Sequence, residues 1–139
     1  MSKRLNRPLL GVAFAALALG ACNMQPKVEP NALPSPAEYK QPLLDHVRSL
    51  LADPTGIRDA YISEPTLTPI GRDTRYVVCI RFNPRDARGQ YSGNQEIAAT
   101  FYDRRITQFT AETRELCARA QYQPFPELEK LCRELRCPA

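Results

Sequence analysis

Cysteine is the residue type in this 139-residue chain with the clearest capacity for chemistry, and the chain has five cysteines. Zinc sites and thiol redox sites use closely spaced cysteine pairs, and this spacing is missing from a sequence with only one His. We therefore expect no metal and no cofactor. The even number of cysteines in the second half of the chain favours structural disulfides, with three possible pairings among Cys79, Cys117, Cys132 and Cys137. We favour Cys132 with Cys137, which closes a short loop, and hence Cys79 with Cys117.

The remaining cysteine, Cys22, ends a segment with the features of an export signal. Residues 1–7 are basic and contain no acidic side chain, and residues 9–19 form an apolar run. Eleven helical residues cover about 16 Å, half of a hydrocarbon core of about 30 Å, so this run is too short for a permanent span. A basic head followed by a short apolar core is typical of a signal peptide.

The segment Leu19-Gly20-Ala21-Cys22 resembles the lipobox of bacterial lipoproteins, in which an aliphatic residue and two small residues precede the cysteine. The resemblance implies that residues 1–21 are a signal peptide, that the Cys22 thiol carries diacylglycerol, and that the acyl chains hold the mature protein on a membrane. Asn23 stands where such proteins carry Asp when they are retained in the inner membrane. We therefore expect the inner leaflet of the outer membrane, facing the periplasm, rather than the inner membrane.

General acid–base chemistry has one imidazole candidate, His46, which follows Asp45 on an expected helix. Adjacent helical residues point about 100° apart, so Asp45 cannot orient His46 as the acid of a catalytic triad does. Glycine-rich phosphate loops and nucleophile elbows are absent from the sequence. We therefore expect no catalytic residues and predict that the protein is not an enzyme.

Arginine dominates the basic residues from residue 22 onward, with 13 Arg against 3 Lys. Over the same residues 16 basic side chains oppose 15 acidic ones, a net charge of +1, which argues against a nucleic-acid partner. Guanidinium groups and Tyr rings recognise carboxylates, phosphates and protein partners well. The candidate partner-binding residues lie around two expected strand connections and are Arg81, Arg85, Arg88, Tyr91, Arg104 and Arg105. The alternative is that they belong to ordinary solvated turns.

The elements that must position these residues begin after a Pro-rich tether, residues 22–35, which is too polar to fold alone. Ser35-Pro36-Ala37-Glu38 is typical of a helix start, and Asp53-Pro54 predicts the helix end. We expect Pro42 to split the first turn from the main helix. One apolar face of this amphipathic helix would consist of Leu43, Leu44, Val47, Leu50 and Leu51.

Alternating apolar side chains predict about four antiparallel strands, at residues 58–64, 76–82, 96–102 and 106–109. We expect Tyr76, Val78, Ile80 and Phe82 to share one face of the second strand, and Ile97, Ala99 and Phe101 to point inward from the third. Short helices are expected at 112–120 and 126–135. The predicted fold is a single α+β domain, residues 36–139, with an N-terminal amphipathic helix, an antiparallel sheet and short C-terminal helices.

Four stretches of this domain together resemble a group of small lipoproteins from rhizobial-type alphaproteobacteria. They are residues 51–54, 57–65, 76–83 and 122–128, which contain the expected helix stop, two strands and a Pro-bounded tail. The resemblance implies an envelope location and implies no particular activity.

These observations favour an outer-membrane lipoprotein with a non-enzymatic binding or structural role, whose partner is another envelope protein or a peptidoglycan-associated component. One alternative is a periplasmic inhibitor of a hydrolase such as lysozyme, and another is a small enzyme. An inhibitor of a basic enzyme would present an acidic or polar loop, whereas the connection at 83–94 contains Arg85 and Arg88 against one acid, Asp86. That composition disfavours the inhibitor hypothesis.

Overall fold

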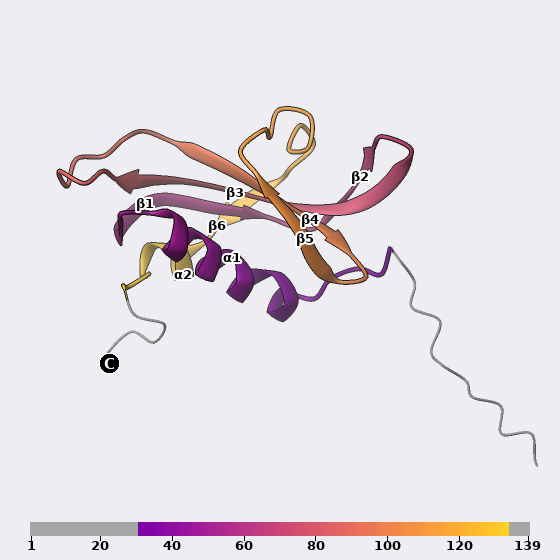
Figure 1. The fold of residues 1–139 in the computed structure, drawn as a ribbon, viewed down its shortest axis with the longest axis horizontal. Coiled ribbons are helices and arrows are strands. Elements are labelled where there is room, and N and C mark those ends of the chain that lie inside the picture. The colour runs from indigo at the N-terminus through magenta and orange to yellow at the C-terminus, as the bar shows by residue number, and fades with distance from the viewer. Residues whose placement is uncertain (1–30, 134–139) are drawn as a thin grey trace, which may run out of the picture.

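The structure is a computed structural model that describes residues 31–133. The predicted signal peptide, Cys22, most of the tether and Cys137 lie outside the described residues. One long helix, α1 (Pro36–Leu50), and one short helix, α2 (Pro126–Glu129), lie against the same face of an antiparallel sheet (Figure 1). The α+β class predicted from the sequence is therefore confirmed.

Helix α1 begins with a capping box, in which the Ser35 backbone N–H donates to Glu38 Oε2 at 2.7 Å. The helix runs unbroken through Pro42, so the expected split is wrong. Pro42 is exposed, and the Glu38 carbonyl that loses its helical partner can bond water instead. No helix within residues 31–133 is long and apolar enough to cross a membrane.

The sheet has six strands rather than about four. Their order is β5-β4-β3-β1-β6, with β2 also paired to β3. The bounds are β1 (Asp53–Ser63), β2 (Thr66–Ile70), β3 (Asp73–Arg85), β4 (Gln95–Tyr102), β5 (Arg105–Thr110) and β6 (Tyr122–Pro124).

The two strands that the sequence did not predict both contain Pro. Pro69 suggested a loop, but β2 pairs with β3 alone, and an edge strand tolerates a residue that lacks an N–H. Strand β6 is three residues long and pairs Pro124 with Tyr61 of β1. Three residues are too few to produce a recognisable alternation.

The expected alternation along the two central strands is confirmed, and it separates two cores. On the helix face, side chains of α1, α2 and the sheet form the larger core, whose members include Tyr39, Leu43, Val47, Val78, Ile80, Phe82, Ile97, Ala99, Phe101 and Leu128. On the opposite face, which we call the second face, a smaller core consists of Val77, Cys79, Ala98 and Cys117. Both faces of the sheet are therefore partly covered.

Residues 111–121, which we call the cover segment, lie over the second face. The sequence predicted a helix at 112–120, but the structure has turns at 114–119, so that prediction is wrong. The Thr113 hydroxyl donates to Glu96 and Cys117 bonds to Cys79, and these attachments to the sheet hold the segment in a non-helical path. The second predicted helix, 126–135, is also too long, because α2 ends at Glu129.

The connection between β4 and β5 forms a two-residue hairpin turn although it contains no Gly. Asp103 and Arg104 have φ values of 50° and 59°. Positive φ at both central residues is characteristic of a type I′ turn, whose twist matches that of the flanking strands. The two strands predicted at 96–102 and 106–109 therefore form a hairpin, with both turn residues in a conformation that favours Gly or Asn.

Candidate functional site

The six candidate partner-binding residues do not form one surface. Arg85, Arg88 and Tyr91 lie near the connection between β3 and β4, whereas Arg104 and Arg105 lie at the turn between β4 and β5 (Figure 1). These connections are at opposite ends of the eight-residue strand β4, about 25 Å apart. The candidates therefore form two separate groups, one at each of the two strand connections around which the sequence analysis placed them.

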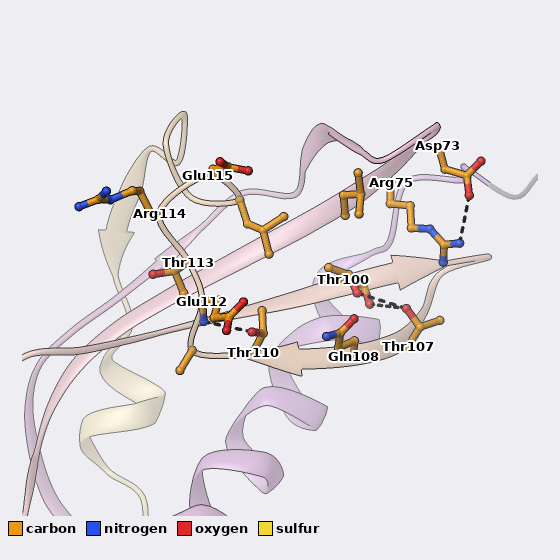
Figure 2. A pocket seen from close by; sticks show the side chains of 13 residues that line it. Asp73, Arg75, Thr100, Thr107, Gln108, Thr110, Glu112, Thr113, Arg114 and Glu115 are labelled. Atoms are coloured by element: carbon orange, nitrogen blue, oxygen red, sulfur yellow. Dashed lines mark hydrogen bonds and ion pairs between the residues drawn. The ribbon is translucent and has the colours of Figure 1, made fainter.

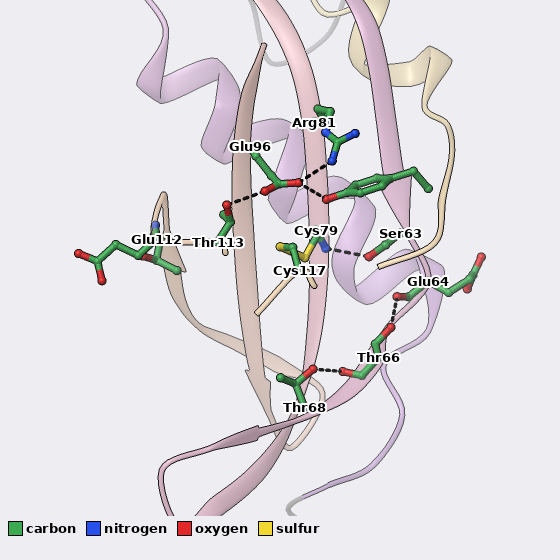
Figure 3. The surroundings of a disulfide bond; sticks show 12 residues. Ser63, Glu64, Thr66, Thr68, Cys79, Arg81, Glu96, Glu112, Thr113 and Cys117 are labelled. Atoms are coloured by element: carbon green, nitrogen blue, oxygen red, sulfur yellow. Dashed lines mark hydrogen bonds and ion pairs between the residues drawn. A yellow bond between two sulfur atoms is a disulfide. The ribbon is translucent and has the colours of Figure 1, made fainter. Parts of the chain in front are cut away.

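Arg81 is exposed, and its guanidinium is paired within the domain. Its Nη2 donates to Glu96 Oε1 at 3.0 Å, and its Cζ lies 4.4 Å from the centre of the Tyr122 ring. Glu96 also accepts from the Thr113 hydroxyl at 2.6 Å and from the Tyr122 hydroxyl (Figure 3). One carboxylate thus joins β3, β4, β6 and the cover segment.

The titration of this cluster follows from its hydrogen bonds. Partial burial alone would raise the pKa of Glu96, but hydrogen bonds from Thr113, Tyr122 and Arg81 outweigh burial and lower it. Burial and the bond to Glu96 raise the pKa of Tyr122. Both groups therefore keep their ordinary charge states at neutral pH, which fits a structural attachment better than proton transfer.

The disulfide beside this cluster joins Cys79 to Cys117, as predicted (Figure 3). The two residues are 38 positions apart, with Cα atoms 5.9 Å from each other. The backbone N–H of Cys79 donates to Ser63 Oγ at 2.9 Å. Cys132 is disulfide-bonded as well, and its expected partner, Cys137, lies outside the described residues.

The connection between β3 and β4, residues 86–94, is ordered by its own hydrogen bonds, and we call it the β3–β4 loop. Asp86 Oδ1 accepts from the backbone N–H groups of Arg88 at 2.8 Å and Gln90 at 2.9 Å. The Asp86 N–H donates to the Gln90 carbonyl at 2.7 Å, and the Gly89 N–H to the Asp86 carbonyl at 3.0 Å. Asp86 therefore holds the tip of the loop through both its side chain and its backbone.

The base of the loop is attached to the sheet. The Gly93 N–H donates to Asn83 Oδ1 at 3.0 Å, and the Tyr91 hydroxyl donates to the Gly56 carbonyl at 3.0 Å. Arg58 Cζ lies 3.6 Å and Arg85 Cζ 5.4 Å from the centre of the Tyr91 ring. Through these contacts the Tyr91 and Arg85 side chains hold the base of the β3–β4 loop against the sheet.

Gly56 permits this packing. Its φ is +67°, and a Cβ at this position would lie 2.8 Å from Arg85 Cζ. Arg85 Nε is buried and has no hydrogen-bond partner within residues 31–133. The Arg85 guanidinium therefore packs against Gly56 of β1, with its Nε buried and the residue as a whole partly exposed.

Arg88 is the member of the predicted set that remains available at this end. It lies at the loop tip, between Ala87 and Gly89, and all three residues are exposed. Its backbone is held by Asp86, whereas its guanidinium has no hydrogen bond or ion pair with any residue of the described chain. At the other end of β4, Arg104 Nε lies 3.7 Å from Glu38 Oε1, and both residues line a hollow of about 640 Å³ with Arg105.

A larger groove of about 990 Å³ lies on the second face (Figure 2). Its floor consists of side chains from β4 and β5, and Figure 2 shows Asp73 and Arg75 on one side and residues 112–115 of the cover segment on the other. The sequence analysis did not predict this groove. The available signal was the polar positions that alternate with the apolar ones in residues 96–102 and 106–109.

The His46 side chain of α1 takes part in the packing between this helix and β5. Its ring stacks on Phe109 with centroids 3.7 Å apart and an interplanar angle of 3°. Burial lowers the pKa of His46. Across residues 31–133 no cluster of three or more His, Cys, Asp or Glu side chains has a metal-binding arrangement.

No match to the chain was found among protein-family models, curated proteins or solved structures. The structure itself therefore provides two candidate sites, the β3–β4 loop with Arg88 at its tip and the groove on the second face.

Proposed function

We propose that this protein is a lipid-anchored component of the bacterial envelope that binds another envelope protein and catalyses no reaction. Cys22 would carry the anchor in the inner leaflet of the outer membrane, and residues 22–35 would separate the domain from the lipid. The support for the anchor is the basic head, the short apolar core and the four residues ending at Cys22.

The order of the β3–β4 loop is the observation that carries the binding role. Most exposed loops lose conformational freedom when a partner binds, and this loss weakens binding. Here Asp86 holds the tip and Tyr91 holds the base before any partner arrives. An Arg on an ordered projection is a frequent centre of binding energy at protein interfaces. Arg88 fits a partner recess that contains a carboxylate, because guanidinium and carboxylate form paired hydrogen bonds.

The test is crosslinking of the full-length lipidated protein in native envelopes, followed by purification and mass spectrometry. We expect one stoichiometric protein partner, and recovery at least about tenfold lower for Arg88→Ala. Arg72→Ala is the matched control, because Arg72 is also exposed on a turn and should not contact the partner. Cys22→Ala should leave the membrane fraction.

Three results would each contradict one part of the proposal. If an efficiently crosslinked sample contains only abundant bystander proteins, the proposal of a stable protein partner is wrong. If Arg88→Ala and the wild type recover the partner equally, the β3–β4 loop is not the binding surface. If Cys22→Ala stays in the membrane fraction, the proposal of a lipid anchor on Cys22 is wrong.

The same loop supports a second candidate, a periplasmic inhibitor of a glycoside hydrolase. Such enzymes usually cleave with a pair of carboxylates in a cleft, and an ordered projection with one free Arg is complementary to that charge. The sequence-based objection counted both Arg85 and Arg88, whereas Arg85 is inserted beside β1. Inhibition of a purified lysozyme by the wild type, with loss in Arg88→Ala, would favour this candidate over a scaffold role.

A further inference from the structure

The groove on the second face is separate from the β3–β4 loop and has the dimensions of a ligand site. Its volume of about 990 Å³ lies at the upper end of the range for small-ligand sites, about 300–1,000 Å³. It occupies the part of the second face beside the cover segment, and Figure 2 shows its lining side chains between Asp73 and Arg75 at one end and Glu112, Thr113, Arg114 and Glu115 at the other. A ligand several rings long would therefore fit along it.

The floor of the groove excludes one common way of binding peptides. Thr100 of β4 pairs with Gln108 of β5 in the antiparallel ladder, so the backbone groups there bond to each other. Peptides that add to a sheet use the free backbone groups of an edge strand, not the face. A ligand in this groove must be recognised by side chains.

The floor side chains offer neutral donors and acceptors. The Thr107 hydroxyl donates to the Thr100 carbonyl at 3.2 Å, and the two Thr hydroxyls lie 3.2 Å apart, so these two groups satisfy each other. Thr110 Oγ1 accepts from the Glu112 N–H at 3.0 Å and keeps its own O–H for a ligand. The Gln108 amide has no hydrogen bond within the described chain, and it offers two donors and one acceptor.

The charges around the groove argue against a polyanion. Three carboxylates line it, those of Asp73, Glu112 and Glu115, against the two guanidiniums of Arg75 and Arg114. Arg75 is already 3.4 Å from Asp73 Oδ2. Phosphate-rich ligands need an excess of positive charge, which this groove lacks.

Apolar surface completes the lining. Ile70 and Leu116 both line the groove and pack against the smaller core. At the Arg75 end, the guanidinium carbon lies 5.2 Å from the centre of the Tyr102 ring, and Tyr102 is 47% exposed. The groove therefore presents aliphatic surface next to neutral hydrogen-bonding groups, and the exposed Tyr102 ring lies outside its lining, next to Arg75.

We propose that this groove binds a neutral glycan, a chain of pyranose rings that carry hydroxyl and acetamido groups. Sugar hydroxyls both donate and accept, which matches the Gln108 amide and the Thr110 hydroxyl. The C–H faces of pyranose rings are apolar and pack on apolar surfaces such as Ile70 and Leu116 in the groove, and on exposed aromatic rings such as Tyr102 beyond its Arg75 end. The proposal does not depend on the β3–β4 loop or on its partner.

The test is co-sedimentation of the full-length lipidated protein, in detergent, with two insoluble polymers. Chitin is a neutral polymer of acetamido sugars, and purified peptidoglycan sacculi add peptide stems with carboxylates. We expect the wild type to bind both. Gln108→Ala and Thr110→Val should each bind about fivefold more weakly, because each removes one or two hydrogen bonds. Arg88→Ala is the control and should bind as the wild type does.

Three outcomes would overturn the glycan site. The first is that the wild type sediments with neither polymer. The second is that it sediments with sacculi alone, which would assign binding to the peptide stems. The third is that both groove variants bind like the wild type. None of these outcomes alters the crosslinking result at Arg88, so the failure of this proposal and the failure of the proposed function are distinguishable.

Discussion

Replacing Glu96 with Ala is expected to lower the free energy of unfolding by about 3 kcal/mol. The Glu96 carboxylate accepts hydrogen bonds from the Thr113 and Tyr122 hydroxyls and from Arg81. Hydrogen bonds to a charged group contribute about 1.5 kcal/mol or more each, so the two hydroxyl bonds account for about 3 kcal/mol. The Arg81 side chain is 45% exposed, and its ion pair adds only about 0–1 kcal/mol. Glu96→Gln keeps one acceptor oxygen and should lose about half as much.

The effect should depend on pH in a stated direction. The folded protein holds the pKa of Glu96 below its ordinary value of 4.5, so the stabilisation is fully present above that value. It is lost as the pH falls through the lowered folded pKa, because the carboxyl is then protonated in both states. The difference between the wild type and Glu96→Ala should therefore be largest near pH 7 and smaller near pH 3.

Urea denaturation with the disulfides intact measures this difference. Glu115→Ala is the control, because Glu115 is exposed and has no hydrogen bond or ion pair within residues 31–133, and it should change stability by less than about 0.5 kcal/mol. A loss below about 1 kcal/mol for Glu96→Ala at pH 7 would refute the argument that this carboxylate attaches the cover segment.

Three further predictions concern the hairpin, the stacked imidazole and the disulfide. Asp103→Asn with Arg104→Gly should raise the unfolding free energy by about 1 kcal/mol in urea denaturation, because both positions have positive φ; no gain would contradict the type I′ assignment. Stability should fall between pH 7 and pH 5.5, because burial lowers the pKa of His46 and the unfolded chain takes up the proton first; urea titrations of His46→Gln should show a smaller fall. Replacing Cys79 and Cys117 together should lower the free energy of unfolding, measured by thermal denaturation, by about 4 kcal/mol, because their bond closes a loop of 38 residues and restricts the unfolded chain; a loss under about 1 kcal/mol would contradict this.

The sequence predicted the elements whose patterns are local. The alternation in residues 76–82 identified the central strand and both of its faces, because Val78 and Ile80 lie in the larger core and Val77 and Cys79 in the smaller one. Ser35 and Glu38 identified the helix start. The pairing of Cys79 with Cys117 followed from counting and loop length, without any structure.

The sequence failed where long-range contacts decide the conformation. Residues 112–120 have a helical composition, but bonds to Glu96 and Cys79 impose turns on them. The candidate partner-binding residues depend on long-range contacts in the same way. Arg81 and Arg85 sit beside Arg88 in the sequence, and only the fold shows that the first is paired with Glu96 and the second packs at Gly56. Amino-acid composition does not distinguish an Arg side chain that is available to a partner from one that is already paired or packed within the domain.

The cover segment makes the order of assembly depend on oxidation. It is attached to the second face by one covalent bond at Cys117, by the polar contacts of Glu96 and by the apolar packing of Leu116 and Ala120. Before that bond forms, Val77 and Ala98 have only the weaker attachment to keep water away from them. We therefore expect the helix face to keep its packing in a reducing environment and the second face to close fully once Cys79 and Cys117 are oxidised. Because the cover segment forms one wall of the groove, the ligand site would be completed at that last step.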